Sequence, residues 1–140
     1  MIVAHPQFES VKSLLASANL PTADLTEDHC RDFFYTGPKD APTGLVGLEL
    51  LGDVALLRSL VVAPGDRKTG AGSALVKHAE AYARDRGVRS LYLLTTTAEP
   101  FFAKRGYERA AREAAPAAIR ATKEFAGLCP ASSAFMSKLL

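Results

Sequence analysis

Apolar residues recur at helical spacing near the start of the chain. They lie three or four positions apart, at Phe8, Val11, Leu14, Leu15 and Ala18. This spacing predicts an amphipathic helix over residues 7–18. Pro21 interrupts the pattern, and a second short helix is expected behind it, with Asp24 or Thr26 as its N-cap.

Apolar runs in the next part of the chain predict strands. The run "DFFYTGPKDAPTG" indicates a short strand followed by a turn rich in glycine and proline. The run "LVGLELLGDVALLRSLVV", residues 45–62, reads as two apolar strands joined at Leu51-Gly52-Asp53. Such a pair with a glycine-containing connection is typical of a hairpin.

After Gly72 the apolar period becomes that of a helix. One stripe holds Leu75, Val76, Ala79, Tyr82 and Ala83, and the opposite side holds Lys77, Glu80, Arg84 and Asp85. Glu80 and Arg84 are one turn apart and are expected to pair on the polar side. Gly87 is expected to end this helix.

The rest of the chain continues the alternation of strands and helices. "RSLYLLTTT" predicts a buried strand, "AEPFFAKRGY" a short helix closed by Gly106, and "SSAFMSKLL" a final strand. Pro116 suits a helix start and Gly127 a helix end. With no repeat or linker to divide it, the chain is predicted to be one domain over residues 1–140, of α/β class with helices on a mixed sheet.

Composition and charge narrow the classes of function. The chain has 140 residues, 48% hydrophobic and 23% charged, with a net charge of +2, so it offers no platform for nucleic acid. No run approaches the length of a membrane span, and the N-terminus lacks the pattern of a signal peptide. Cys30 and Cys129 are far apart and are expected to be free thiols in a reducing cytoplasm.

The glycine-rich stretch "LVVAPGDRKTGAG", residues 60–72, follows an apolar strand and precedes a helix. A Walker loop is excluded, because Ala71-Gly72 stand where lysine and a hydroxyl residue are needed. A dinucleotide fingerprint is excluded too, because Leu75 replaces its third glycine. The remaining pattern, R-x-x-G-x-G over residues 67–72, suits a pyrophosphate bound without metal at a helix N-terminus. A strand-to-helix turn with no ligand is the alternative.

The stretch "ALLRSLVVAPGDRKTGAGSALVKHAEAYARDRGVRSLYLLTTTAEPFFAKRGY" resembles the acetyl-CoA-binding core of the GNAT superfamily of N-acetyltransferases. This resemblance implies the GNAT fold, a central mixed β-sheet flanked by helices, with acetyl-CoA as co-substrate and no metal. The whole chain, including "LPTADLT" and "EFAGLCPASSAFMSK", further resembles the arsenic-resistance-associated subgroup of that superfamily.

The resemblance also implies which residues bind the donor. Backbone N–H groups of Arg67, Lys68, Thr69, Gly70, Ala71 and Gly72 would hold the pyrophosphate. The edge of the strand at Leu60, Val61 and Val62 would pair with pantetheine, and Phe102 would lie beside it. One N–H group there would polarise the thioester carbonyl while a substrate amine attacks it.

Two positions that carry acid–base groups in many members are apolar in this chain. Leu56 stands where a glutamate often acts as base, and Phe102 stands where a tyrosine often protonates the departing thiolate. Glu49, between Leu48 and Leu50 in the preceding strand, is therefore the candidate proton acceptor. Tyr107 is expected to pack in the core.

Three residues are candidates for binding the acceptor: Arg58, Thr95 and Arg112. Arg58 lies on the central strand and Thr95 at the end of the following one. The segment from Arg112 to Pro130 is expected to form a helix over the acceptor side, where Arg112 or Arg120 could hold a carboxylate with two hydrogen bonds.

The sequence predicts an N-acetyltransferase for a small-molecule amine, with no nucleic-acid or membrane partner. The first alternative is a non-catalytic acyl-CoA-binding module, suggested by Leu56 and Phe102. The second is an arsenical or metal binder that uses Cys30 and Cys129. The oligomeric state is left open between a monomer and a homodimer.

Overall fold

The computed structural model describes residues 1–66, 69–129 and 132–140. Its strands form one sheet in the order β1-β2-β3-β4-β5-β7-β6. They are β1 (Val3–Ala4), β2 (Phe33–Thr36), β3 (Gly44–Leu51), β4 (Val54–Val62), β5 (Ser90–Thr95), β6 (Glu108–Arg109) and β7 (Ala134–Leu139). β4 and β5 run parallel and the other neighbours antiparallel, so the predicted mixed sheet is confirmed.

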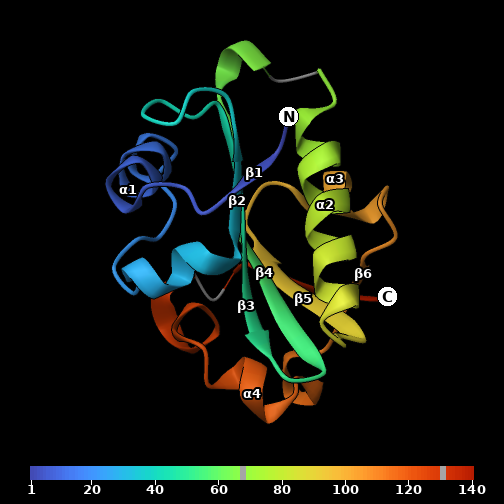
Figure 1. Ribbon diagram of the computed structural model, residues 1–140. Helices are drawn as coiled ribbons and strands as arrows, with labels where there is room; N and C mark the ends of the chain where they lie inside the picture. The colour runs from blue at the N-terminus through green and yellow to red at the C-terminus, as the bar shows by residue number, and fades with distance from the viewer. Residues whose placement is uncertain (67–68, 130–131) are drawn as a thin grey trace.

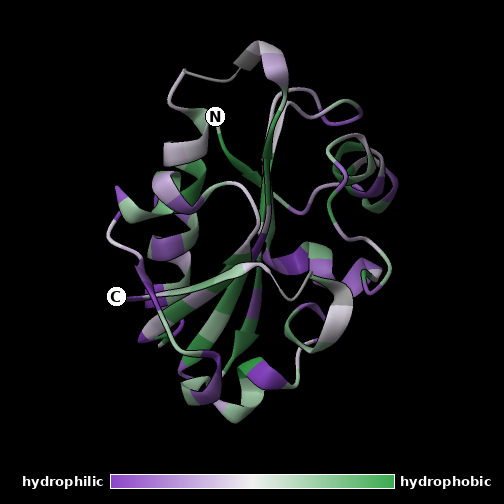
Figure 2. Ribbon diagram, turned by 180° about the vertical axis from the view of Figure 1, so that it is seen from behind, coloured by the Kyte–Doolittle hydropathy of each residue, from purple (hydrophilic) through white to green (hydrophobic). Residues whose placement is uncertain are grey.

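Helices cover both faces of this sheet. They are α1 (Phe8–Ser17), α2 (Ala71–Asp85), α3 (Glu99–Ala103) and α4 (Ala117–Arg120), with 3-10 turns η1 (Glu27–Asp32), η2 (Pro64–Asp66) and η3 (Arg112–Ala114) and a π-helical turn η4 (Glu124–Leu128). Figure 1 shows α1 and α2 on opposite sides of the sheet, and Figure 2 shows the apolar strands between them. None of the described helices combines the length and the apolar character that crossing a membrane requires.

The alternation of side chains along the strands explains why two helices can share one sheet. Phe34 and Val46 point to the face covered by α2, where they join its apolar stripe. Their neighbours Phe33, Tyr35 and Leu45 point the other way and pack with α1. Because successive residues of a strand face opposite sides, a nearly continuous apolar run is what a doubly covered strand needs.

The predicted hairpin is present between β3 and β4. Leu51 pairs with Val54, and Gly52 between them has φ +83°, a left-handed conformation that glycine adopts without strain. The N-terminal helix, the helix after the glycine loop and the last strand also lie where the sequence predicts them. The two-residue edge strands β1 and β6 are too short to produce a pattern.

Two sequence predictions about elements are wrong. Glu80 does not pair with Arg84 on the polar side of α2; it is buried, accepts a hydrogen bond from Tyr107 Oη (2.9 Å) and lies 3.0 Å from Lys138 Nζ. The partners come from later parts of the chain that periodicity cannot reveal. Residues 112–130 do not form one helix, because the described part contains three separate turns, η3, α4 and η4.

Candidate active site

A pocket opens where β4 and β5 separate. Within the described residues their parallel ladder joins Val54–Leu56 to Ser90–Tyr92, although both strands continue further. The pocket has a volume of about 370 Å³ and is lined by residues 57–60 of β4 and by 93–97 at the end of β5. Phe102, Glu124, Cys129 and Ser133 close it from other segments. Residues 57–60 of β4 thus border the pocket beyond the point where its ladder with β5 ends.

A bulge in β4 lies beside this pocket. Leu45 faces Val61 and Gly47 faces Arg58, so β4 carries one more residue than β3 over this interval. Ser59, inside it, has φ +61°, in the left-handed region that side chains rarely adopt. Bulges redirect the strand's peptide groups and occur next to active sites. The bulge therefore changes which β4 peptide groups face the pocket at Ser59.

The glycine stretch leads into the N-terminus of α2. Gly70 is the N-cap with φ +86°, and the first turn carries no acidic residue. A Cβ built on Gly72 would lie 3.3 Å from the Phe101 ring, so a side chain there would be tight. The backbone N–H groups of a first helical turn and the positive end of the helix dipole are the features that attract anions to helix N-termini. Arg67 and Lys68, which the resemblance places in the same site, lie outside the described residues.

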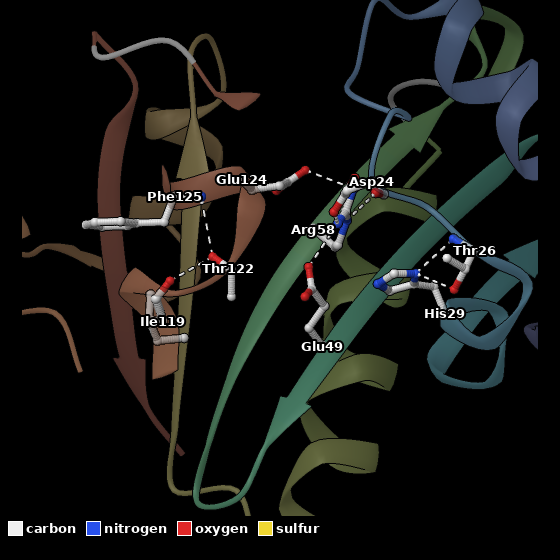
Figure 3. Close-up of polar contacts among 10 residues, drawn as sticks. Asp24, Thr26, His29, Glu49, Arg58, Ile119, Thr122, Glu124 and Phe125 are labelled. Atoms are coloured by element: carbon white, nitrogen blue, oxygen red, sulfur yellow. Dashed lines mark hydrogen bonds and ion pairs between the residues drawn. The ribbon is translucent and has the colours of Figure 1, made fainter. Parts of the chain in front are cut away.

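Arg58 is the centre of a buried charge cluster (Figure 3). Its Nη1 and Nη2 donate to the two oxygens of Asp24 at 2.5 and 3.0 Å. Nη1 also donates to Glu49 Oε2 at 2.9 Å, and Nη2 lies 3.1 Å from Glu124 Oε2. The Arg58 side chain is 0% exposed. One guanidinium thus faces three carboxylates, and the cluster carries an excess of negative charge whenever all three are ionised.

The cluster moves the pKa values of its members in different directions. Burial raises the pKa of Glu124 to about 7, helped by Asp24 and Glu49 and opposed by Arg58 and by a hydrogen bond from the Cys129 thiol. For Asp24 burial acts upward, yet its hydrogen bonds to Arg58 and the charge of Arg58 hold its pKa below the usual range. Asp24 is therefore the permanent counterion, and Glu124 can exchange a proton near neutral pH.

Two further polar groups, Cys129 and Ser133, line the same pocket as Glu124. Burial raises the pKa of Cys129 to about 11, and the charge of Glu124 acts in the same direction. Ser133 is 5% exposed, and its Oγ has no hydrogen-bond partner among the described residues. A buried hydroxyl without a partner is costly unless something else satisfies it. This side of the pocket is therefore prepared for a polar group.

The structure brings together only some of the residues singled out from the sequence. Leu60, Phe102, Arg58 and Thr95 line the pocket. Thr95 Oγ1 also accepts a hydrogen bond from the N–H of Ala98 at 3.0 Å. Thr69 and Ala71 lie with the two glycines at the start of α2.

The other candidates lie behind or beside the pocket. Val61 packs with the core under α1 and Val62 against the core under α2. Glu49 reaches the pocket only through Arg58 and is not among its lining residues. Arg112 donates from Nη2 to the Ser133 carbonyl at 2.8 Å, so it lies next to the lining rather than in it.

Sequence reasoning did not identify Glu124, Cys129 and Ser133 as a group. They occur at the end of the segment predicted to form a helix over the acceptor side, but no residue spacing there matches a known motif. The available signal was composition: a carboxylate, a thiol and a hydroxyl within ten positions. Their convergence on β4 depends on the turn η4 and on the return of the chain into β7.

The apolar positions that replace the usual acid–base groups are part of the core. Leu56 is fully buried with Ala115, Ile119 and Phe135.

Tyr107 is buried and its hydroxyl donates to Glu80. Burial, and then the charge of Glu80, raise the pKa of Tyr107 far above its ordinary value, and Tyr107 is not a lining residue. It packs as the sequence predicted.

One group of side chains in the described residues could in principle hold a metal ion. Ligand atoms of Asp24, His29 and Glu49 lie within 4.8 Å of one another. Arg58 Nη1 donates to both carboxylates, and His29 Nδ1 accepts from the N–H of Thr26 at 3.0 Å. A guanidinium already supplies the positive charge here, so the arrangement does not favour a second cation.

Comparison with known proteins gives a consistent family of matches. The model of the "Acetyltransferase (GNAT) family" matches residues 5–108. An amino-acid acetyltransferase of Ralstonia nicotianae is 46% identical over 57 residues, which is 41% of this chain and 13% of that protein. An uncharacterized N-acetyltransferase of Chlorobaculum tepidum is 33% identical over 93 residues, which is 66% of this chain and 59% of that protein. The chain thus spans only part of these relatives.

Solved structures show the same fold. N-acetylglutamate synthase from Neisseria gonorrhoeae, complexed with coenzyme A and L-arginine, aligns with a TM-score of 0.82 and 22% identity over 100% of this chain and 33% of that one. A Mycobacterium tuberculosis protein in complex with CoA aligns with a TM-score of 0.79 and 19% identity, covering 100% and 99%.

Proposed function

Since this chain belongs to the acetyltransferase (GNAT) family, we propose that it transfers an acetyl group from acetyl-CoA to a small-molecule amine by direct attack. The observation that carries the proposal is the pocket between the separating strands β4 and β5, bordered by the bulge at Ser59. Such a pocket presents strand backbone to a thioester. The N-acetyltransferases named among the relatives support the same reaction.

The donor is proposed to lie along β4 and to end at α2. The pyrophosphate of acetyl-CoA would accept hydrogen bonds from backbone N–H groups of Gly70, Ala71 and Gly72 at the start of α2, and the resemblance adds Arg67, Lys68 and Thr69. Pantetheine would pair with β4 at Leu60 to Val62 and pass Phe102. Dipole and N–H groups together bind the anion, so no metal is required.

The reaction then proceeds by addition and elimination at the thioester carbon. The amine nitrogen forms a bond to the carbonyl carbon, the carbon–sulfur bond breaks, and the amine loses a proton to a base. Backbone N–H groups of β4 are proposed to stabilise the oxygen that becomes negative. Phe102 has no proton to give, so CoA leaves as a thiolate, which is a good leaving group.

An acceptor with a carboxylate would need a cation near the pocket. Arg58 is already bound by three carboxylates, so its charge is compensated. We therefore assign a positioning role to Arg58 and keep Arg112, held beside Ser133, as the candidate that binds an acceptor carboxylate. The relatives named amino-acid acetyltransferase favour an acceptor of this class. Thr95 would line the acceptor side.

The test is a screen of amines that measures release of free CoA, accompanied by calorimetry with CoA. Turnover with at least one amine and metal-independent CoA binding are expected. CoA binding without turnover on any amine would instead support the alternative of a non-catalytic acyl-CoA-binding module, which the apolar residues Leu56 and Phe102 favour. Absence of CoA binding would contradict both functions.

Two finer proposals remain, and only the first of them rests on the sequence resemblance. The first is a link to arsenic resistance, which predicts that cells expressing the chain tolerate amine-bearing arsenicals better than cells expressing an inactive variant. The second is assembly as a homodimer, which light scattering during gel filtration would measure directly. Neither is needed for acetyl transfer in the pocket.

A further inference from the structure

Glu124 is the carboxylate that faces the pocket. Among the described lining residues, the side chains that carry charge are Arg58 and Glu124. The guanidinium of Arg58 is fully buried and bound to Asp24, Glu49 and Glu124. A proton released inside this pocket therefore has one nearby carboxylate to accept it, and that carboxylate comes from η4 rather than from the central strands.

We propose that Glu124 is a catalytic residue that accepts the proton of the attacking amine, in place of Glu49. This inference rests on the proposed acetyltransferase function. As the nitrogen–carbon bond forms and the carbon–sulfur bond breaks, one amine proton moves to a Glu124 oxygen, and CoA departs as a thiolate. Glu124 then returns the proton to solvent or to that thiolate, so the protein ends each cycle unchanged.

The groups around Glu124 suit a base that both holds and releases a proton. Arg58 binds Oε2 at 3.1 Å and fixes the orientation of the carboxylate. Asp24 and Glu49 share that guanidinium, so the positive charge does not act on Glu124 alone. Cys129 also lines the pocket, and its main-chain N–H donates to the Glu124 carbonyl at 3.1 Å. The resulting pKa of Glu124, about 7, is near the value at which a general base is most effective.

A second, independent feature points to a polar ligand at this wall. Ser133 is buried, lines the same pocket and has an Oγ with no partner in the described part of the chain. An amine or ammonium group entering beside Glu124 would supply a donor for that oxygen. The unpaired hydroxyl and the carboxylate line one pocket, which is where the acceptor nitrogen is expected to lie.

Glu49 and Glu124 form a matched pair for the test. Both bind the guanidinium of Arg58, with side chains 16% and 6% exposed. Only Glu124 lines the pocket. A replacement of either by glutamine removes one negative charge from the same cluster, so a difference between the two variants reports contact with the reacting atoms rather than the charge of the cluster.

The experiment measures kcat and kcat/KM of the wild type, Glu124→Gln, Glu124→Asp and Glu49→Gln from about pH 6 to about pH 9. The acceptor is a weakly basic amine found in the CoA-release screen, so that its own nitrogen does not titrate in this range. Acetyl-CoA affinity is measured by calorimetry, and folding by the melting temperature. Glu124→Asp keeps the charge and serves if the glutamine variant unfolds.

Glu124→Gln is expected to lower kcat about 100-fold or more at the upper pH while the affinity for acetyl-CoA changes less than about three-fold. The fall of kcat/KM below about pH 7 that we expect of the wild type should disappear in this variant. Glu124→Asp should retain that fall and part of the activity. Glu49→Gln should lose about ten-fold or less and keep the same pH dependence, because it acts through Arg58.

Each other outcome counts against the inference. Turnover of a folded Glu124→Gln within about three-fold of the wild type, with an unchanged pH profile, overturns it. A pH profile that flattens in Glu49→Gln instead assigns the base to Glu49. If the wild type binds CoA but acetylates no amine, the proposed function fails and takes this inference with it; that failure is recognised before any variant is compared.

Discussion

At the scale of single residues, Arg58 connects parts of the chain that are distant in sequence. Its guanidinium joins the loop before η1 through Asp24, the neighbouring strand through Glu49 and the turn η4 through Glu124. Burial alone would lower the pKa of Arg58, but the bonds to Asp24 and the charges of Glu124 and Asp24 raise it well above its usual value. Arg58 is therefore a permanent cation that positions the carboxylates.

Removing this cation should be costly for the fold. Arg58→Met leaves Asp24, Glu49 and Glu124 buried without a counterion, and we expect a loss of about 3–5 kcal/mol in the free energy of unfolding. Arg31→Gln, which breaks an exposed pair with Asp28 (3.7 Å), is the control and should change it by less than about 0.5 kcal/mol. Urea denaturation measures both. Equal stability of Arg58→Met and the wild type would contradict a structural role for the cluster.

The raised pKa of Glu124 has a signed effect on stability. The folded chain holds a proton up to about pH 7, whereas the unfolded chain loses it near 4.5. The stabilisation of the folded state that comes from this proton is fully present below pH 4.5 and is lost as the pH rises to about 7. Above that pH it no longer changes. Across this pH window we expect the free energy of unfolding of the wild type to fall by about 3 kcal/mol relative to that of Glu124→Gln. Urea denaturation at several pH values checks it; parallel curves would contradict the shift.

Tyr107 should contribute to stability and not to turnover. Its hydroxyl is buried and bonded to Glu80 at 2.9 Å, outside the pocket. Tyr107→Phe removes one hydrogen bond to a charged group, so we expect a loss of about 1.5–3 kcal/mol in the free energy of unfolding. Turnover should stay within about three-fold. Loss of turnover at unchanged CoA affinity and melting temperature would make Tyr107 the missing acid.

At the scale of elements, β4 and α2 are the two elements at which we propose that the donor binds. β4 provides the bulge at Ser59 and the edge that faces the pocket, and α2 begins at Ala71, directly after its N-cap Gly70. Each element alone has an ordinary conformation for its residues.

A charge at the start of α2 should therefore block the donor. Gly72→Glu places a side chain against the Phe101 ring and a negative charge where the pyrophosphate is proposed to bind. We expect the affinity for CoA to fall roughly 30-fold or more, since the favourable dipole contact becomes a repulsion. Ala81→Glu, exposed in the middle of the same helix, is the matched control. Calorimetry that gives equal affinities for the two variants would exclude this pyrophosphate site.

At the scale of the whole molecule, three apolar clusters meet on β4. Ala55 and Leu57 belong to the core under α2, Val61 to the core under α1, and Leu56 to a smaller core that includes Ile119 of α4. Side chains of β4 thus pack into all three clusters. The pocket lies along residues 57–60 of β4. We therefore expect a bound ligand to change the surroundings of β4 residues without rearranging the fold.

The two cysteines report on different parts of this architecture. Cys30 is buried in the core under α1, whereas Cys129 lines the pocket. We expect an alkylating reagent at mildly alkaline pH to modify Cys129 first, slowly because its pKa is about 11, and CoA to slow that reaction about ten-fold or more. Cys30 should react only on unfolding. Peptide mass spectrometry identifies each site, and an unprotected Cys129 would place CoA elsewhere.

The sequence by itself determined the local features: the amphipathic helices, the hairpin at Gly52, the glycine-rich start of α2 and the absence of the usual acid–base groups at Leu56 and Phe102. These depend on residue period and on glycine geometry over a few neighbouring positions. The fold class and the expected position of the donor site can therefore be predicted from the order of residues alone.

Only the tertiary structure decided which side chains share the pocket. Asp24 and Arg58 are 34 positions apart in the sequence. Glu124 comes from the turn η4, which the spacing of apolar residues does not predict. A carboxylate on a surface and one buried beside a guanidinium look identical in a sequence, because the difference lies in desolvation and in charges brought by other segments. The role proposed for Glu124 thus arises from packing, which the order of residues does not display.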